Sequence, residues 1–385
     1  MKIIFNRRNI LEAVSPLLCA VSTKDTLASI KGILIEAVEP DTCTLTTFDL
    51  EKGVQISIHT PVKEGGTFIV NAQKFNQTLK VMDGDEVTLT VDDSLTATIE
   101  AGKSNHKMNA LRGSDFPEIP HLPEDRGFVM KQGVLKRMLS KVMFAMGVND
   151  QRPVLNGCYF KVVEQNFLLV SCDSYRMAKC AISTEMENMN TRGEPMKFSF
   201  ILPHETVEEL FRMLRDEDEE DIRLCMTRRT IMMKMGDLIF FSRLIDGEYI
   251  EYDAFIMKNH KILVDVDRVA LLSALERAAV VTEERTAKAL RSWVKLTTEE
   301  NILKVSSNSS EGSTYEELEV NHEGGDILIA FNNRYLIDTL RACTADRVTL
   351  EMTSAYNSIN IRPTVENEGE TELFMLLPVR MKDSD

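Results

Sequence analysis

The sequence predicts an α+β protein built from three similar domains, because two apolar patterns each occur three times in the same order. The first pattern is a short apolar strand followed by a helix with apolar residues three and four apart. It covers residues 3–18, 128–142 and 262–278. The chain has 385 residues, of which 43% are hydrophobic, enough for two or three domains with separate cores. We therefore expect repeats of about 125 residues, within the usual size range of domains.

The second pattern is a strand, a helix, a polar turn and a closing strand, and it covers residues 68–91, 200–224 and 328–352. The closing strands alternate apolar and polar residues, which is typical of strands with one buried face. Because both patterns keep their order, we expect each domain to place two helices on curved antiparallel sheets. Chance similarity among β-α patterns is the alternative, and a threefold match of two independent patterns makes it the weaker one.

Two polar stretches, near residues 121–126 and 257–261, predict the linkers between the repeats. They divide the chain into predicted domains of residues 1–124, 125–258 and 259–385.

The charge is distributed unevenly between the predicted helices and the rest of the chain. The net charge of −15 by itself argues against non-specific nucleic-acid binding. The six helices nevertheless carry a net charge of +8, so that the remainder carries −23. If the helices share one side of the sheets, that side suits a phosphate backbone without base reading. The alternative is that these charges only solvate exposed helix faces, which fits the acidic helix 204–215 better. The helices are predicted over residues 6–18, 73–81, 131–145, 204–215, 268–281 and 333–341.

The sequence contains no recognisable catalytic or cofactor site. It has no phosphate-binding G-x-x-x-x-G-K-[ST] loop, no H-E-x-x-H helix and no G-x-S-x-G elbow. The six histidines are dispersed, and the acidic run 216–221 is more typical of a solvated turn than of a metal site. We therefore predict a protein that is not an enzyme and uses no cofactor or metal. A nuclease or transferase that relies on acidic residues is the alternative.

The composition predicts a soluble, cytoplasmic protein. Its seven cysteines form no C-x-x-C pair, and their odd number fits reduced thiols better than a disulfide framework. No apolar run approaches the ~18 residues of a membrane helix. The first residues lack the ordered regions of a secretory signal peptide.

Short motifs along the whole chain carry a family resemblance. The strand 155–160 contains Leu-Asn-Gly, and residues 171–178 contain Asp-Ser-Tyr-Arg-Met-Ala. Each motif alone is weak, whereas their order, the triple repeat and the chain length together are specific. The chain thereby resembles the bacterial sliding clamp family, the beta subunit of DNA polymerase III. Further matching segments are residues 115–117, 244–249, 329–332 and 376–381.

The resemblance implies a DNA clamp fold and a head-to-tail homodimer that closes into a ring around duplex DNA. Helices would line the hole and the sheets would form the outside. Such a ring tethers the replicative DNA polymerase and other replication and repair proteins during processive DNA replication, and a clamp loader opens it. It would act in the cytoplasm at the nucleoid, as a non-catalytic processivity subunit of the DNA-directed DNA polymerase. A clamp-fold scaffold that binds peptides without encircling DNA is the alternative.

The resemblance also implies a pocket for partner peptides between the second and third domains. An apolar cleft with a few polar groups is a suitable receptor for short peptides with leucine or phenylalanine anchors. Ile250 and Ala254 depart from the family pattern at the rim of the pocket, and Cys172 replaces a usual threonine. Ordinary core packing is the alternative for the apolar members. The implied pocket residues are Leu155, Cys172, Ser174, Tyr175, Arg176, Met177, Ile250, Ala254, Phe255, Met375, Leu377, Pro378, Val379, Arg380 and Met381.

Two further residue sets follow from the resemblance. Pro153 and Val154 stand where the family often has aromatic residues, which weakens any expectation of base stacking. His106 stands where an aromatic residue is common, so a weaker or pH-sensitive ring is expected. The implied DNA contacts are Lys24, Lys74, Lys136, Arg137, Lys141, Asn149 and Arg152. The implied dimer residues are Lys74, Lys103, His106 and Met108 on the first domain, and Val280, Val281, Glu311 and Glu316 on the third.

Overall fold

The computed structural model describes most of the chain, which divides into two compact units. Unit 1 comprises residues 1–133, 186–195 and 212–244, and unit 2 comprises residues 134–185, 196–211 and 245–385. Each unit is described by itself. The described residues are 1–22, 27–120, 124–190, 193–217, 219–282, 284–285, 290–291, 293–309 and 312–380.

The first repeat contains two helices, each entered directly from a strand. Asn6 and Asn71 cap these helices, since their side chains accept hydrogen bonds from backbone N–H groups of the first turn. The elements are β1 (Lys2–Asn6), α1 (Arg7–Leu17), β2 (Gly32–Val38), β3 (Thr42–Phe48), β4 (Lys52–His59), β5 (Val62–Glu64), β6 (Gly66–Asn71), α2 (Ala72–Val81), β7 (Glu86–Val91), β8 (Thr96–Ala101) and β9 (Ser104–Arg112).

The second repeat has the same order of elements. The predicted helix 131–145 ends at Val142 and continues as one 3-10 turn, Met143–Ala145. The elements are β10 (Gly127–Lys131), α3 (Gln132–Val142), β11 (Gly157–Val163), β12 (Asn166–Cys172), β13 (Arg176–Ser183), β14 (Glu187–Asn188), β15 (Lys197–Pro203), α4 (His204–Met213), β16 (Asp221–Met226), β17 (Thr230–Met235) and β18 (Leu238–Arg243).

The third repeat keeps this order and adds a short hairpin after its first helix. The hairpin is β20 (Glu284–Arg285) paired with β21 (Leu290–Arg291). The remaining elements are β19 (Ile262–Asp267), α5 (Arg268–Thr282), β22 (Trp293–Glu299), β23 (Ile302–Asn308), β24 (Ser313–Glu319), β25 (Asn321–Glu323), β26 (Leu328–Asn332), α6 (Asn333–Ala342), β27 (Arg347–Met352), β28 (Ile359–Pro363) and β29 (Glu370–Leu376).

One hydrogen bond occurs in all three repeats and confirms that they are structural copies. The first backbone N–H of the first helix donates to the carbonyl that precedes the closing strand. The side chains of Arg7 and Arg268 strengthen the same junction, because their guanidinium groups donate to carbonyls at the end of the second helix. Both arginines therefore hold two helices together instead of standing free in solvent. The three backbone bonds are Arg7 N to Asp85 O at 2.8 Å, Gln132 N to Glu220 O at 2.8 Å, and Arg268 N to Asp346 O at 2.9 Å.

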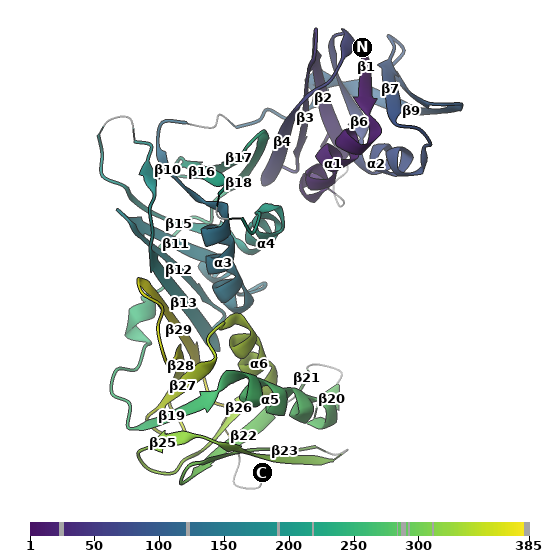
Figure 1. Cartoon of the computed structure of the whole chain (residues 1–385). Helices are drawn as coiled ribbons and strands as arrows, with labels where there is room; N and C mark the ends of the chain where they lie inside the picture. The colour runs from purple at the N-terminus through teal and green to yellow at the C-terminus, as the bar shows by residue number, and fades with distance from the viewer. Residues whose placement is uncertain are drawn as a thin grey trace. The chain divides into compact units, whose positions relative to one another are not determined.

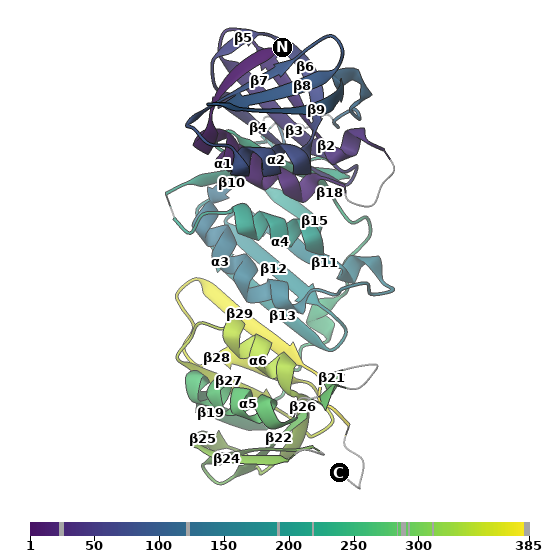
Figure 2. The same cartoon turned by 90° about the vertical axis from the view of Figure 1, so that its right-hand side faces the viewer.

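The strands form one large sheet in unit 1 and three sheets in unit 2. In unit 1 the order is β14-β10-β16-β17-β18-β4-β3-β2-β6-β9-β8-β7-β1-β5, and every described pair is antiparallel. In unit 2 a nine-stranded sheet has the order β15-β11-β12-β13-β29-β28-β27-β19-β25, and a four-stranded sheet has the order β24-β23-β22-β26. Within unit 2, α5 and α6 lie side by side over one face of the strands (Figures 1 and 2).

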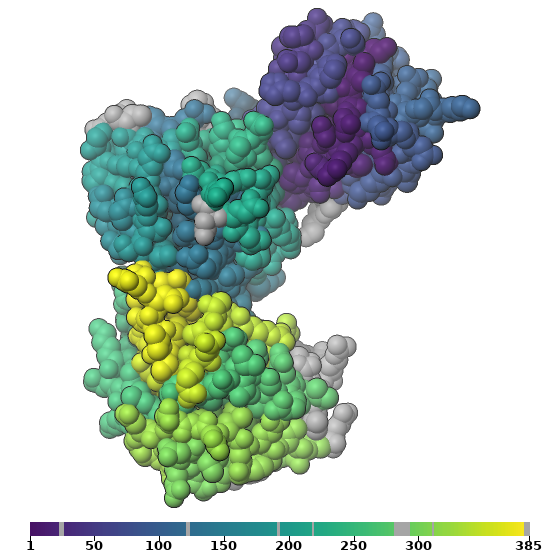
Figure 3. Space-filling model, viewed as in Figure 1, coloured from purple at the N-terminus to yellow at the C-terminus, as the bar shows by residue number. Residues whose placement is uncertain are grey.

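The β13–β29 pair joins the second repeat to the third within the nine-stranded sheet. It runs from Arg176 opposite Leu376 to Ile182 opposite Glu370. This pairing brings residues about two hundred positions apart into register, as backbone ladders do. The predicted pocket residues Met177 and Met375 lie opposite each other in this pair. β29 is almost entirely buried, whereas other residues of the C-terminal part of the chain, coloured yellow in Figure 3, are visible at the surface of unit 2.

Candidate functional site

A buried apolar cluster lies at one end of the β13–β29 junction. Met177 of β13 pairs directly with Met375 of β29, and both side chains are at most 8% exposed. The cluster is completed from the 3-10 turns Pro153–Leu155 and Tyr252–Ala254 and from β12. Its buried members are Leu155, Val170, Cys172, Met177, Tyr252 and Met375, and half-buried Val154, Tyr159, Leu168, Tyr249, Ile250 and Ile256 pack against them.

Three tyrosines form one wall of this cluster. The rings of Tyr159 and Tyr249 are stacked with centroids 5.0 Å apart, and the ring of Tyr252 lies 6.0 Å from that of Tyr159. Burial raises the pKa of Tyr252 to about 12 and raises the pKa of Tyr249 further. The wall is therefore uncharged at neutral pH and presents flat, rigid rings of the kind that anchor binding interfaces.

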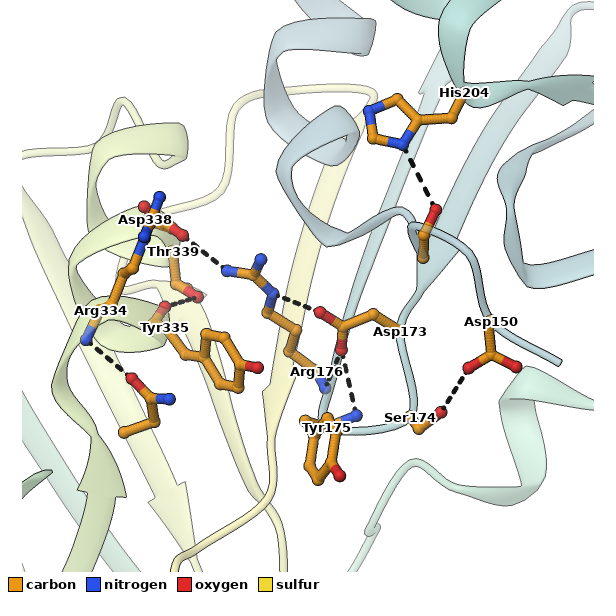
Figure 4. A network of polar contacts seen from close by, with 12 residues as sticks. Asp150, Asp173, Ser174, Tyr175, Arg176, His204, Arg334, Tyr335, Asp338 and Thr339 are labelled. Atoms are coloured by element: carbon orange, nitrogen blue, oxygen red, sulfur yellow. Dashed lines mark hydrogen bonds and ion pairs between the residues drawn. The ribbon is translucent and has the colours of Figure 1, made fainter. Parts of the chain in front are cut away.

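A hydrogen-bonded turn, residues 173–176, joins the cluster members Cys172 and Met177, and its polar contacts are drawn in Figure 4. The Asp173 carboxylate accepts hydrogen bonds from the backbone N–H groups of Tyr175 and Arg176, at 3.1 and 3.0 Å. Ser174, which lies between Asp173 and Tyr175, has a φ of +79°, in the left-handed region that residues with a Cβ seldom adopt. Tyr175 projects from the turn and is 60% exposed.

Arg176 connects this turn to the third repeat. Its guanidinium donates to Asp173 at 2.8 Å and to Asp338 of α6 at 2.7 Å. The same group lies 4.3 Å from the ring centroid of Tyr335 and 5.2 Å from that of Phe144. Two ion pairs and two ring contacts fix this arginine, whose planar fork suits such a site.

The residues that follow β29 add an exposed apolar surface. Leu377 N–H donates to the Tyr175 carbonyl at 2.9 Å, and Val379 N–H donates to the Ala330 carbonyl at 2.7 Å. Leu377 and Val379 are 40% and 42% exposed, and Phe255 is 54% exposed. A buried apolar cluster with an exposed apolar margin and a few fixed polar groups suits a short peptide with apolar anchors.

The structure brings most of the predicted pocket residues together. Leu155, Cys172, Met177, Ile250 and Met375 share the apolar cluster. Leu377, two residues after Met375, bonds to the Tyr175 carbonyl, whereas Val379 bonds to Ala330 of β26. Pro378 is half-buried, Arg380, Ala254 and Phe255 are exposed, and Met381 lies outside the described residues. Our sequence reasoning missed several residues of this site, although some of them, including Tyr249 and Tyr252, stand in or next to a segment that matched the family. The missed residues are Phe144, Val154, Tyr159, Leu168, Val170, Asp173, Tyr249, Tyr252, Ile256, Tyr335 and Asp338.

The predicted DNA contact at Lys141 is wrong. The side chain of Lys141 is 1% exposed, and its ammonium group forms ion pairs with Glu370 and Glu372 of β29. A lysine sealed from solvent and already paired with two carboxylates cannot reach a phosphate group. Lys74 and Arg137 are exposed and Lys136 is half-buried, with its ammonium 5.6 Å from the Phe211 ring centroid. Lys24 lies outside the described residues.

The other two predicted DNA residues lie in a loop of unit 2 before η5 (Pro153–Leu155). Asn149 is exposed and has a φ of +56°. Arg152 is half-exposed but not free, because its guanidinium bonds to Asp150 and to Ser174. These positions remain predictions for DNA contact.

The predicted dimer residues of the first repeat border a groove of about 660 Å³ in unit 1. Lys74, His106 and Met108 line it, together with Val81, which is 72% exposed. Lys103 stands in the turn before β9. β9 pairs with β6 only over Ala110–Arg112, so among the described strands none pairs with Ser104–Asn109 on that side.

The predicted dimer residues of the third repeat lie on α5 and β24. Val280 is 85% exposed near the end of α5. Glu316 of β24 bonds to Arg277 of α5 at 2.7 Å, and β24 is the terminal strand of its four-stranded sheet. Glu311 and the side chain of Val281 lie outside the described part of the chain.

The described residues show neither a metal site nor a membrane-spanning helix. Among them, no group of three or more His, Cys, Asp or Glu residues is placed to hold a metal ion. None of the helices in that part of the chain is both long and apolar enough to cross a membrane.

Three family models match consecutive parts of the chain. They are the N-terminal, central and C-terminal domains of the DNA polymerase III beta subunit, matched at residues 1–120, 129–251 and 254–378. The chain belongs to the DNA polymerase III beta subunit family. It consists of three domains with the DNA clamp fold, each with two helices on antiparallel sheets.

Curated relatives and solved structures agree with this membership. The chain is 27% identical to the beta sliding clamp of Staphylococcus aureus, over 99% of both chains. It is 28% identical to the beta sliding clamp of Haemophilus influenzae, over 99% of this chain and 100% of that one. The crystal structure of the Bacillus subtilis DNA polymerase sliding clamp matches with a TM-score of 0.91 over 99% of this chain and 100% of that chain. At 24% identity, that likeness concerns the fold.

Proposed function

We propose that this protein is a DNA sliding clamp that encircles duplex DNA and tethers the replicative polymerase. The observation that carries the proposal is the full-length threefold repeat, in which every domain presents a helix pair, combined with family membership over the whole chain. In this role the protein is a non-catalytic processivity subunit that works in the cytoplasm at the nucleoid. The comparisons do not favour a clamp-fold scaffold that leaves DNA alone.

DNA contact in a sliding clamp has to be weak and independent of sequence. Exposed cations such as Lys74 and Arg137 supply phosphate contacts of this kind. Three of the basic helix residues stabilise the fold and are not available to phosphate groups. Arg7 and Arg268 donate to backbone carbonyls, and Lys141 forms buried ion pairs. The cationic surface is therefore smaller than the sequence count indicated, which fits topological retention better than tight binding.

We infer a head-to-tail dimer in which β9 of one chain pairs with β24 of a second chain. Both strands have an open edge among the described strands, and the unpaired N–H and C=O groups of such an edge can pair with a strand of another chain. Their charges are complementary. β9 and its preceding turn carry Lys103 and Lys107, whereas β24 carries Glu316, Glu317 and Glu319. A heterologous contact of this kind closes into a ring when its rotation closes.

We also propose that the cluster around Leu155, Met177 and Met375 receives peptides from the polymerase, the clamp loader and other partners. The support is the combination of a buried apolar cluster, exposed Leu377 and Val379, and a fixed polar turn. Peptides with leucine and phenylalanine anchors have the chemistry to fill it.

A topological experiment tests the proposed function. The protein is loaded onto nicked circular duplex DNA with a matched clamp loader, and the circle is then cut once. We expect retention on the intact circle and release on cutting, because a ring slides off a free end. Equal retention before and after cutting would indicate ordinary contact binding and contradict encirclement. Failure to load, with a loader shown to work on its own clamp, would support the scaffold.

A further inference from the structure

The turn that carries Tyr175 is held by a second loop, which no comparison assigns to the peptide site. The Ser174 hydroxyl donates to Asp150 Oδ2 at 3.2 Å and also contacts the guanidinium of Arg152 (Figure 4 shows the Asp150 contact). Arg152 in turn bonds to the Asp150 carboxylate through Nε at 3.2 Å. These three side chains form a closed triangle, in which Ser174 lies 22 positions from Arg152 and 24 from Asp150 along the chain.

We propose that Asp150 and Arg152 are positioning residues for the partner peptide, which act by fixing Ser174 and thereby the direction of Tyr175. This inference rests on the proposed peptide-binding role of the pocket. It assigns Arg152 to the partner site instead of to DNA.

The first support is the backbone of Ser174. A residue with a Cβ is disfavoured at a φ of +79°, so something must hold it there. The hydroxyl contacts to Asp150 and Arg152 provide that hold. Asp173 holds the next two N–H groups, and Leu377 N–H is bonded to the Tyr175 carbonyl. The turn is thus fixed on both sides of the exposed Tyr175 ring.

The second support is the rigidity of the loop that supplies Asp150 and Arg152. The Asn156 side chain accepts from Asp150 N–H at 2.7 Å and donates to the Asp150 carbonyl at 2.9 Å. Asp150 Oδ1 accepts from Arg152 N–H at 2.9 Å. This loop ends at Leu155, which is fully buried in the apolar cluster. The loop therefore holds the turn at a fixed position relative to the buried residues of the proposed pocket.

The third support is electrostatic. Hydrogen bonds from Arg152 are the main reason that the pKa of Asp150 lies below its usual value. The carboxylate therefore remains charged, and keeps accepting from Arg152 and Ser174, across the pH range in which binding is measured.

The consequence for binding concerns preorganisation. Tyr175 lies 6.2 Å from the Tyr335 ring, so a turn held in place presents two aromatic rings from two domains to one ligand. Releasing the turn adds conformational freedom that a peptide must remove when it binds, which lowers affinity without removing any contact residue.

The test is fluorescence anisotropy with a fluorescein-labelled short peptide that carries leucine and phenylalanine anchors. We expect Arg152→Ala and Ser174→Ala each to raise Kd about three- to tenfold, as loss of a hydrogen bond does. Ser174→Gly should weaken binding similarly without lowering the thermal unfolding midpoint, since glycine tolerates a positive φ. Gln151→Ala, an exposed change in the same loop, is the matched control and should bind as the unaltered protein does.

A double-mutant cycle separates positioning from a general loss of structure. Because Arg152 acts through Tyr175, the combination of Arg152→Ala with Tyr175→Ala should bind no more weakly than Tyr175→Ala alone. Additive losses in the cycle would overturn the inference. So would an unchanged Kd in Arg152→Ala, and reduced retention on circular DNA in that variant would then return Arg152 to the DNA surface.

A different set of results would show that the proposed pocket itself is wrong. Leu377→Asp should abolish peptide binding if the pocket is correct, whatever the role of Arg152. If Leu377→Asp is silent, or if the unaltered protein does not bind the peptide, the pocket itself is wrong and the positioning role falls with it.

Discussion

The two ends of the β13–β29 junction are held by opposite kinds of chemistry. At one end, Lys141 is sealed between Glu370 and Glu372, and all three side chains are at most 8% exposed. At the other end, Met177 and Met375 belong to an apolar cluster whose margin reaches solvent through Leu377. Buried ions tolerate no loss of a partner, whereas an apolar surface with an open margin can exchange solvent for a ligand. The charged end therefore fixes the junction, and the proposed peptide pocket lies at the apolar end.

The largest expected effect, and the strongest test of the difference between the two ends, comes from removing the buried cation. Lys141→Met should destabilise the protein by about 3–5 kcal/mol, because it leaves two buried carboxylates without their partner. The measurement is denaturant unfolding followed by the fluorescence of Trp293, the single tryptophan, which lies in the same unit.

Two further variants identify the cause. Arg137→Met, at an exposed position of the same helix, should change stability by no more than about 0.5 kcal/mol. Replacing all three charges, as Lys141→Met with Glu370→Leu and Glu372→Leu, should recover most of the loss, since no unpaired charge remains. A Lys141→Met protein as stable as the unaltered one would show that the charged end does not fix the junction.

At the apolar end, removal of the C-terminal residues should cost binding and leave the junction intact. Deleting residues 377–381 should weaken partner-peptide binding at least about a hundredfold, because it removes the exposed apolar margin and its anchors. Sedimentation should still find the dimer, since the proposed seam uses β9 and β24. If the dimer is lost together with peptide binding, the C-terminus is structural and the pocket assignment fails.

These predictions also show which parts of the molecule the sequence could reveal. The helices and their order were predictable because apolar periodicity is a local signal, and 3–18 and 262–278 show the same pattern. Lys141 was misread because its two carboxylate partners lie 229 and 231 positions away along the chain. The same helical pattern fits an exposed or a buried lysine. Only the register of β29, which carries both carboxylates, determines that Lys141 is buried.

The pocket was partly predictable for a related reason. Family motifs with short local signatures marked Leu155 in a 3-10 turn, Met177 in β13 and the segment after β29. The tyrosine wall was missed because Tyr159 meets Tyr249 and Tyr252 only after the chain between them has folded. No local pattern distinguishes such a tyrosine from one on any half-buried strand.

A rise in pH through the lysine range should weaken the charged end, and comparison with the triple replacement isolates this contribution from that of the buried tyrosines at the apolar end. Burial lowers the pKa of Lys141, but hydrogen bonds to Glu370 and Glu372 more than offset this, so the folded-state pKa is raised. Its stabilising contribution is therefore fully present below the ordinary lysine pKa of about 10.4 and is lost as pH rises through the higher folded-state pKa. Unfolding midpoints between pH 9 and 11.5 should fall more steeply for the unaltered protein than for the triple replacement. Parallel curves would contradict this assignment.

The smallest expected effect compares two buried thiols, one at each end. Cys172 lies in the apolar cluster and is 7% exposed, whereas Cys180 is fully buried beside Met138 and near Glu370. Burial raises the pKa of both thiols, so both should react slowly with N-ethylmaleimide. Because the apolar end opens more readily, we expect Cys172 to be modified about tenfold faster than Cys180, as followed by site-resolved mass spectrometry.

Bound peptide should narrow this difference in modification rate, because it should act on Cys172 alone. A peptide that fills the pocket should slow modification of Cys172 and leave Cys180 unchanged, since Cys180 reports on the charged end. Half-exposed Cys19, in the other unit, is an internal standard for reagent activity. Equal rates at the two thiols would mean that the junction opens as a whole. Protection of both by peptide would mean that binding at the apolar end tightens the charged end as well.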